Sequence, residues 1–166
     1  EQIVSESVPF GGYRQFQVFD PKERLITVAP FWQRVLHHAI MLVCEPYLEN
    51  RLVLWTYACR KGKGRIAALD AAARHCRKYT WYLKLDIRKY FDYVPHDRLL
   101  ERLRGIFKDA ALLRLLEGII RSYGVVPGRG LPIGNLTSQH FANLYLDGLD
   151  RFIEGFASRE EQGCVR

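Results

Sequence analysis

The segment at residues 80–87, "TWYLKLDI", constrains the fold of this chain more than any other feature. Apolar side chains alternate along it with more polar ones, the apolar set being Trp81, Leu83, Leu85 and Ile87. This period of two predicts a β-strand with one buried face. Asp86 falls on the opposite face, next to the end of the strand. The question is whether this carboxylate is incidental or functional.

The rest of the chain predicts a mixture of helices and strands. Two runs joined by "DPKE" predict a hairpin over residues 13–28, with Pro21 in its turn. Apolar residues at helical spacing, with Pro, Asp and Gly at the ends, predict five helices. These are expected at about 30–49, 66–78, 95–107, 109–123 and 137–156. The predicted fold class is α+β, with helices packed on an antiparallel sheet.

Composition excludes some classes of protein and favours others. The chain of 166 residues is 48% hydrophobic, enough for one core. Its formal net charge of +7 favours a polyanionic partner. The longest apolar run, Ala39 to Cys44, is too short to span a bilayer. Because the cysteines lack C-x-x-C spacing, we expect a cytoplasmic protein with reduced thiols, no zinc site and no membrane partner.

Asp86 is a candidate metal ligand because of the residues that follow it. Taken alone, it is a solvated aspartate near the end of a strand. Mg²⁺, however, prefers carboxylate oxygens together with substrate phosphates, and a strand holds such a ligand still. Arg88, Lys89 and Tyr90 come next, and cations with an aromatic ring suit a nucleotide and its triphosphate. Asp92 is better explained as a cap of the helix that Pro95 opens.

Two basic segments are candidate phosphate contacts. Lys22 and Arg24 lie near the expected hairpin tip, where they either close over phosphates or are simply solvated. The loop "CRKGKGR" is either a flexible solvent loop or a nucleic-acid contact. Its basic residues are Arg60, Lys61, Lys63 and Arg65.

The stretch "GLPIGNLTSQHFANLYLDGLD" contains a predicted turn. Gly134 and Asn135 interrupt the chain just before Thr137 and Ser138, which can cap a helix. A glycine allows the backbone to approach a ligand closely. An ordinary junction between a loop and a helix is the alternative.

Two of these motifs together resemble a known family. "DIRKYFDYVPH", followed by "GLPIGNLTSQHFANLYLDGLD", is similar to the reverse transcriptases of bacterial retroelements, which are RNA-directed DNA polymerases. The resemblance implies a right-hand polymerase fold. Residues 1–80 would form the fingers and residues 81–166 the N-terminal part of the palm. The rest of the palm and the thumb would be absent.

The resemblance also implies roles for individual residues. Asp86 would be the first metal-binding aspartate, and the carbonyl of Ile87 a neighbouring ligand. Tyr90, or less favourably Phe91, would stack under the sugar and exclude a 2′-hydroxyl. Nucleotide-binding residues would be Lys22, Arg24, Arg88, Lys89, Tyr90, Phe91, Ile133 and Gly134. Nucleic-acid-binding residues would be Arg60, Lys61, Lys63, Arg65, Asn135, Ser138 and Gln139.

The palm loop departs from the commonest pattern of the family. Many members have Gln-Gly and then Ser-Pro where this chain has Ile133–Gly134 and Ser138–Gln139. This form resembles the enzymes of diversity-generating retroelements, which copy a template RNA with errors at adenines. Replacing a hydrogen-bonding Gln by Ile133 would loosen the positioning of the incoming nucleotide. Defence-associated and group II intron-like reverse transcriptases are the alternative subgroups.

A second departure concerns catalysis. The tyrosine-x-Asp-Asp motif of the family appears nowhere in the chain, which has no Asp-Asp pair. The complete enzyme would hold two Mg²⁺ ions with Asp86 and that missing pair, so we expect this chain alone to be inactive. The implied partners are a template RNA, a DNA primer, deoxynucleoside triphosphates and the missing palm and thumb. A basic accessory protein is a further candidate partner.

Two other classes of function are also considered. A non-catalytic nucleic-acid-binding module would keep the basic loop and aromatics but need no metal. A metal-dependent nuclease would need more clustered acids, and Asp147 and Asp150 look solvated on their helix. The nuclease is therefore the least favoured.

Overall fold

The computed structural model describes residues 8–19 and 22–161, with side chains as far as residue 156. The hairpin turn at Asp20 and Pro21 lies outside the described residues. The hairpin and the five predicted helices lie close to their predicted ranges, and a further short helix at residues 90–93 was not predicted. In chain order the elements are β1 (Arg14–Phe19), β2 (Glu23–Val28), α1 (Phe31–Glu49), α2 (Arg65–Lys78), α3 (Tyr90–Tyr93), α4 (His96–Ile106), α5 (Ala110–Arg121) and α6 (Leu136–Glu161).

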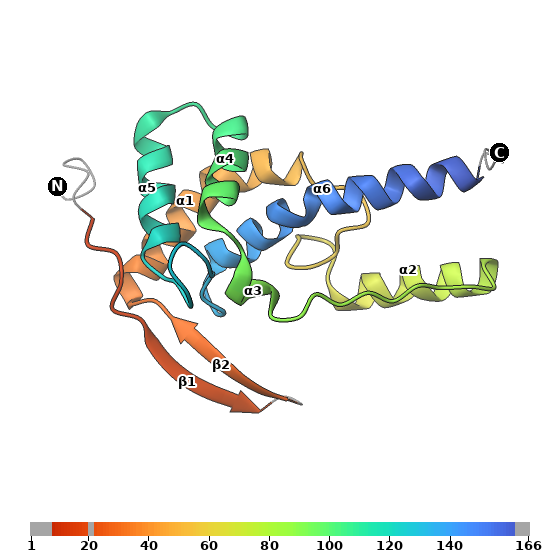
Figure 1. Cartoon of the computed structure of the whole chain (residues 1–166), viewed down its shortest axis with the longest axis horizontal. Coiled ribbons are helices and arrows are strands. Elements are labelled where there is room, and N and C mark those ends of the chain that lie inside the picture. The colour runs from red at the N-terminus through yellow and green to blue at the C-terminus, as the bar shows by residue number, and fades with distance from the viewer. Residues whose placement is uncertain (1–7, 20–21, 162–166) are drawn as a thin grey trace.

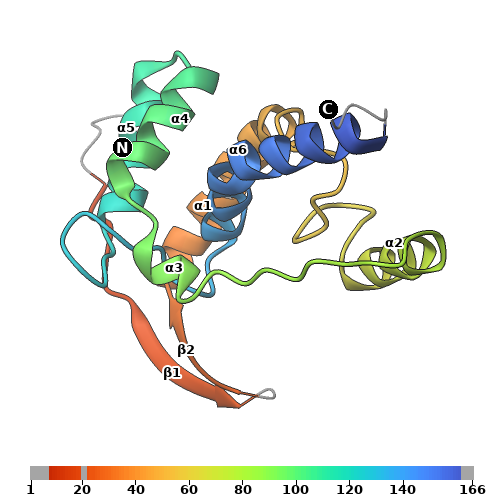
Figure 2. The same cartoon turned by 45° about the vertical axis from the view of Figure 1, so that its right-hand side comes forward.

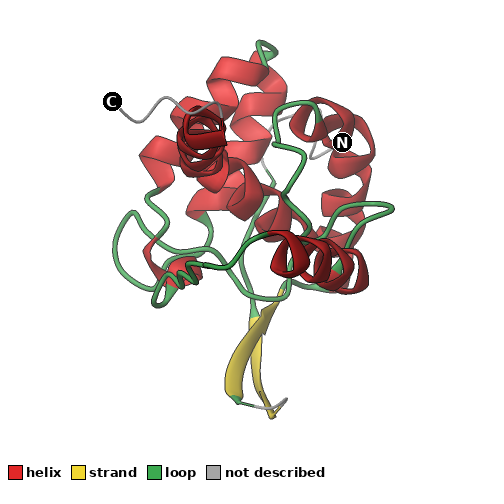
Figure 3. Cartoon of the chain, turned by 90° about the vertical axis from the view of Figure 1, so that its right-hand side faces the viewer, coloured by secondary structure: helices red, strands yellow, loops and turns green. Residues whose placement is uncertain are grey.

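The two strands form an antiparallel hairpin that stands away from the helices (Figures 1 and 3). Arg14 pairs with Val28 at one end of the ladder and Phe19 with Glu23 at the other. Eight of the twelve strand residues are exposed, and only Thr27 is buried. The fold is therefore α+β, but the expectation that helices pack on the sheet is wrong. A two-stranded ribbon offers too little apolar surface to form the floor of a core.

The core lies between helices. α6 packs against α1 and α4, and α4 packs against α5. Leu99 and Leu103 of α4, Leu116 of α5 and Cys44 of α1 are all fully buried. Within α4, Leu99 and Leu103 are four residues apart, the spacing that places apolar residues on one helical face.

The start of α5 confirms a prediction from the sequence. The Asp109 carboxylate accepts a hydrogen bond from the backbone N–H of Leu112 at 2.7 Å. This bond satisfies one of the donors that every helix leaves free at its first turn.

Residues 80–87 do not form the predicted strand. Within the described part of the chain, they pair with no other strand. The chain runs in extended form from α2 to α3 (Figure 2), and Trp81 and Leu83 are 90% and 82% exposed. The alternation predicted one buried face, but burial needs a second layer. An extended chain also becomes a strand only when another backbone satisfies its polar groups.

Candidate functional site

The turn before α6 is fixed to the base of the hairpin. The backbone N–H of Thr27 donates to the carbonyl oxygen of Ile133 at 2.7 Å. Gly134 has a φ of +125°, and a Cβ there would meet Cγ2 of Ile26 at 2.9 Å and the Thr27 carbonyl oxygen at 3.1 Å. Only glycine fits both this backbone conformation and this close approach. The turn is therefore held in contact with β2.

Asn135 adds a second link between the same two segments. Its Oδ1 accepts a hydrogen bond from the backbone N–H of Ala29 at 3.2 Å. Asn135 and Ser138 are each only 2% exposed, whereas Gln139 is half-buried. Of these three predicted nucleic-acid contacts, Gln139 alone keeps a partly exposed side chain, while Asn135 has a structural role.

The short helix α3 is attached to the same region. Lys89 precedes it with a φ of +51°, and the backbone N–H of Leu131 donates to the Phe91 carbonyl oxygen at 2.8 Å. The Tyr90 hydroxyl donates to the carbonyl oxygen of Ala142 in α6 at 2.7 Å. Burial, with Tyr145 nearby, raises the pKa of Tyr90, so the hydroxyl stays protonated as a donor.

These links bring three segments together that are distant in the sequence: the hairpin base, the turn at 131–135 and α3. Ile133 and Phe91 are half-buried in this assembly. The hairpin and the extended segment before α3 lie on the same side of the helical body (Figures 1 and 2). The four basic residues predicted to bind a nucleotide from these two segments are all exposed, namely Lys22, Arg24, Arg88 and Lys89. This side of the molecule therefore presents cations next to a glycine turn and two aromatic rings.

Asp86 is exposed in the extended segment, and Ile87 is 47% exposed. The carboxylate is thus accessible to a cation. Among the side chains described, at residues 8–19 and 22–156, however, no three of His, Cys, Asp or Glu group together as a metal site would require. Among the described side chains, Asp86 is therefore an accessible carboxylate that belongs to no such group.

The basic loop after α1 is partly structural. Arg60 pairs with Glu49 at 2.7 Å and donates to the carbonyl oxygens of Val53 and Thr56. The Lys63 ammonium donates to the Leu54 carbonyl oxygen. Two of the four predicted phosphate contacts thus hold the loop together.

Lys61 and Arg65 are the exposed cations of this loop. Of the four predicted phosphate contacts, these two therefore have charges that face solvent. The sequence could not separate the two pairs, because all four cations lie in one short polar run.

The comparison with protein families decides what kind of chain carries these features. The family model described as "Reverse transcriptase (RNA-dependent DNA polymerase)" matches residues 19–165. The chain belongs to the reverse transcriptase family. The match includes the hairpin ladder from Phe19 onward, the segment around Asp86, and the turn at Ile133 and Gly134.

Three relatives of this reverse transcriptase chain have names that refer to introns. It is 27% identical, over 89% of its length, to the "Uncharacterized 91 kDa protein in cob intron" of Schizosaccharomyces pombe. It is 25% identical over 86% to the "Nuclear intron maturase 4, mitochondrial" of Arabidopsis thaliana, and 23% identical over 80% to the group II intron-encoded protein LtrA of Lactococcus lactis. The chain spans between 18% and 23% of the length of these three relatives.

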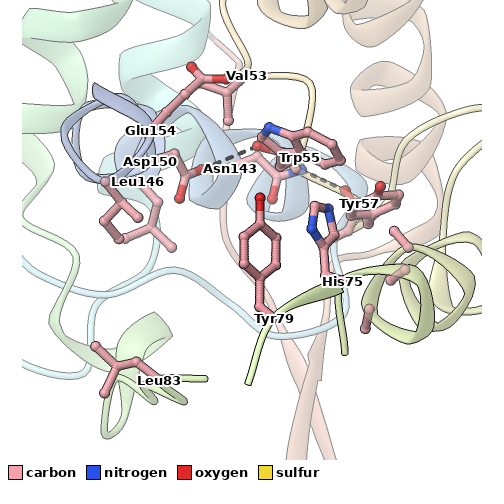
Figure 4. A pocket seen from close by; sticks show the side chains of 16 residues that line it. Val53, Trp55, Tyr57, His75, Tyr79, Leu83, Asn143, Leu146, Asp150 and Glu154 are labelled. Atoms are coloured by element: carbon pink, nitrogen blue, oxygen red, sulfur yellow. Dashed lines mark hydrogen bonds between the residues drawn. The ribbon is translucent and has the colours of Figure 1, made fainter. Parts of the chain in front are cut away.

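A large open cavity of the reverse transcriptase chain was not anticipated from the sequence. It measures about 1280 Å³ and lies between α2, α6, the loop at 53–58 and the start of the extended segment (Figure 4). Trp55 meets the edge of His75 at 5.3 Å, and His75 stacks on Tyr79 at 5.9 Å between ring centroids. No sequence pattern predicts this cavity, because its walls come from segments without a shared motif.

Two acids of α6 are less solvated than the sequence suggests. Asp147 is 9% exposed and pairs with Arg151 at 3.0 Å. Asp150 is half-buried and accepts a hydrogen bond from the Thr56 hydroxyl at 3.2 Å. Both contacts are structural, so these acids add nothing in favour of a nuclease.

No helix in the part of the chain that the structure describes has the length and apolar character needed to cross a bilayer.

Proposed function

We propose that this chain takes part in RNA-templated DNA synthesis, as the fingers (residues 1–80) and the first part of the palm (residues 81–166) of a polymerase. The observation that carries the proposal is the link between Thr27 and Ile133. It joins a basic hairpin to the glycine turn within the segment that matches the reverse transcriptase family. The substrates would be deoxynucleoside triphosphates on a template RNA and a DNA primer.

Phosphate binding follows from the charges on this side of the molecule. Lys22 and Arg24 would hold the triphosphate from the hairpin, and the backbone amides of Arg88 and Lys89 would meet it from the extended segment. Their exposure and shared side of the molecule support this arrangement. Most catalysis of nucleotidyl transfer comes from positioning and charge, which such groups supply.

Asp86 would contribute one ligand to Mg²⁺, with the Ile87 carbonyl beside it. A single carboxylate cannot hold the two ions that clamp the attacking and leaving oxygens. We therefore propose that further carboxylates complete the site and that the 166 residues alone do not extend a primer.

The aromatic pair at the start of α3 would select the sugar. The hydrogen bond from Tyr90 to Ala142 and the edge contact with Phe91, at 5.6 Å between ring centroids, hold the Tyr90 ring in place. A fixed ring suits steric exclusion of a 2′-hydroxyl. Phe91 is the second candidate, since its side chain is also half-buried at this position.

The subgroup is a separate part of the proposal. Ile133 in place of a hydrogen-bonding side chain favours an error-prone enzyme of the diversity-generating type. The relatives favour a group II intron-like enzyme, because LtrA is intron-encoded and the Arabidopsis relative is a maturase. In an intron-like enzyme, the RNA partner would be the intron itself.

The decisive experiment is Asp86→Asn in the full-length protein, with Asp70→Asn on α2 as the control, since Asp70 is an exposed aspartate too. We expect Asp86→Asn to reduce primer extension on an RNA template by at least about 100-fold, because metal binding stabilises charge by several kcal/mol. Binding of RNA should persist, and the control should retain synthesis. Unchanged synthesis in Asp86→Asn would remove Asp86 from the catalytic site. No synthesis by the unaltered protein, with RNA binding present, would support a non-catalytic nucleic-acid-binding module.

A further inference from the structure

A second, smaller cavity lies between α1 and the beginning of α6. It has a volume of about 260 Å³. Its walls include Arg34, His37 and His38 from α1, and Asn135 and Gln139 from the turn and first helical turn. Every polar side chain among its lining residues can donate a hydrogen bond, and none of the lining residues is an acid.

Two buried side chains in this wall lack hydrogen-bond partners. His37 is 1% exposed, and neither of its ring nitrogens is hydrogen-bonded among the described residues. Asn135 is 2% exposed and uses Oδ1 for Ala29, but its Nδ2 has no partner there either. A buried polar group without a partner destabilises the folded state. Two such groups on one cavity indicate that something else satisfies them.

The start of α6 adds more donors at the same place. The first four backbone N–H groups of a helix have no acceptor within the helix, and α6 is 26 residues long. A long helix presents a partial positive charge at this end, and anions bind there readily. The Oδ1 of Asn135 accepts from the Ala29 N–H. It can accept at most one further hydrogen bond, so it cannot satisfy all four of these groups.

We propose that this cavity binds one phosphate group. The Nδ2 of Asn135, one ring N–H of His37 and the backbone N–H groups at the start of α6 would donate to its oxygens. Arg34, exposed at the rim, would add positive charge, and the exposed His38 is a further hydrogen-bond donor there. The proposal does not depend on polymerase activity, because it uses only the donors in this wall.

The first test is the thermal unfolding midpoint of the chain in inorganic phosphate, compared with chloride at equal ionic strength. Phosphate at a hundredfold excess over its Kd should raise the midpoint by roughly 5–10 °C, since it binds only the folded state. In parallel, the ¹⁵N signals of the His37 ring should shift on titration. His37→Phe identifies these signals by removing them.

Charge reversal at the cavity supplies the matched variant. Gln139→Glu places an anion at the wall, and an acid in the first turn of a helix does not itself destabilise the fold. Ala110→Glu makes the same change in the first turn of α5, where the residue is exposed. We expect Gln139→Glu to lose at least three quarters of the phosphate-induced shift and Ala110→Glu to keep it. If the shift survives in Gln139→Glu, or appears while the His37 signals stay still, the proposal is overturned. It is also overturned if phosphate produces no shift.

A final experiment tests whether the bound phosphate group belongs to a polynucleotide backbone or to a small molecule. A short DNA oligonucleotide without terminal phosphates contains only phosphodiesters. If it moves the His37 signals and competes with inorganic phosphate, the cavity takes the backbone of a polynucleotide. If inorganic phosphate alone moves them, the cavity takes a small phosphate-bearing molecule. Both results support a phosphate site.

Discussion

Thr27 and Ile133 are joined by a backbone hydrogen bond of 2.7 Å between N–H and carbonyl oxygen. This bond fastens the hairpin of the reverse transcriptase chain to the turn before α6, although the two segments are far apart in the sequence. Asn135 reinforces it through Ala29. Any displacement of the hairpin base is therefore transmitted to the turn, which we propose lies beside the incoming nucleotide.

Gly134→Ala should destabilise the chain more than Gly128→Ala. Both glycines have positive φ, at +125° and +71°, but only Gly134 faces close neighbours, since an added Cβ would lie 2.9 Å from Cγ2 of Ile26. Backbone strain alone costs about 1 kcal/mol, whereas strain plus the clash should cost roughly 2–3 kcal/mol. Urea unfolding of both variants measures the difference. Equal losses would show that the close approach is not important.

In the basic loop, we expect Arg60 to contribute to the stability of the fold and Lys61 to contribute to nucleic-acid binding. Arg60→Ala should lower the free energy of unfolding by roughly 2–3 kcal/mol, because it leaves the half-buried Glu49 and two carbonyl oxygens unpaired. Lys61→Ala should leave stability unchanged, since Lys61 is exposed.

Lys61→Ala should change nucleic-acid binding although it leaves stability unchanged. If Lys61 contacts a phosphate, Lys61→Ala should reduce the slope of log affinity against log salt by about 0.7–0.9. Fluorescence anisotropy with a labelled RNA at several salt concentrations tests this. A slope identical to that of the unaltered chain would remove Lys61 from the interface.

His37 should make stability depend on pH between about 4 and 6.5. Burial, with a smaller contribution from His38, lowers the pKa of His37 to about 4 in the folded chain, against an ordinary value near 6.5 when unfolded. In this window the unfolded state binds more protons, so stability falls as the pH falls. The loss should reach roughly 3 kcal/mol at pH 4.

This dependence is measured by unfolding in chloride buffers free of phosphate, which avoids any anion that changes the charge around His37. His37→Phe should flatten the dependence. His38→Gln, which alters the exposed neighbour, should retain most of it. A His37→Phe profile parallel to that of the unaltered chain would refute the assignment.

Ile133→Gln tests the proposed link to fidelity. The substitution supplies a hydrogen-bonding side chain at a half-buried position of the turn. We expect misincorporation opposite adenine to fall in the full-length protein, by roughly tenfold if one well-placed hydrogen bond is gained. Sequencing of the products gives the error rate, with Ile133→Val as the apolar control. Unchanged misincorporation in Ile133→Gln contradicts the idea.

The sequence by itself determined the hairpin, the family and five of the six helices in the described part of the chain. Periodicity locates α4 and α5 because a helix buries residues at a fixed spacing, and Asp109 caps α5 through atoms only three residues away. Such signals are local, so they survive in a single sequence. The motifs around Asp86 and Gly134 are local in the same sense, and the family match over residues 19–165 agrees with them.

The tertiary structure decided which of these residues are available for function. Asn135 is buried against Ala29, and Arg60 is taken up by Glu49, although both looked like nucleic-acid contacts. Residues 80–87 alternate like a strand but have no partner strand in the described part of the chain. In each case, whether the residue is available depends on a hydrogen bond, an ion pair or a strand pairing with another segment of the chain. No pattern within one short stretch of sequence contains that information.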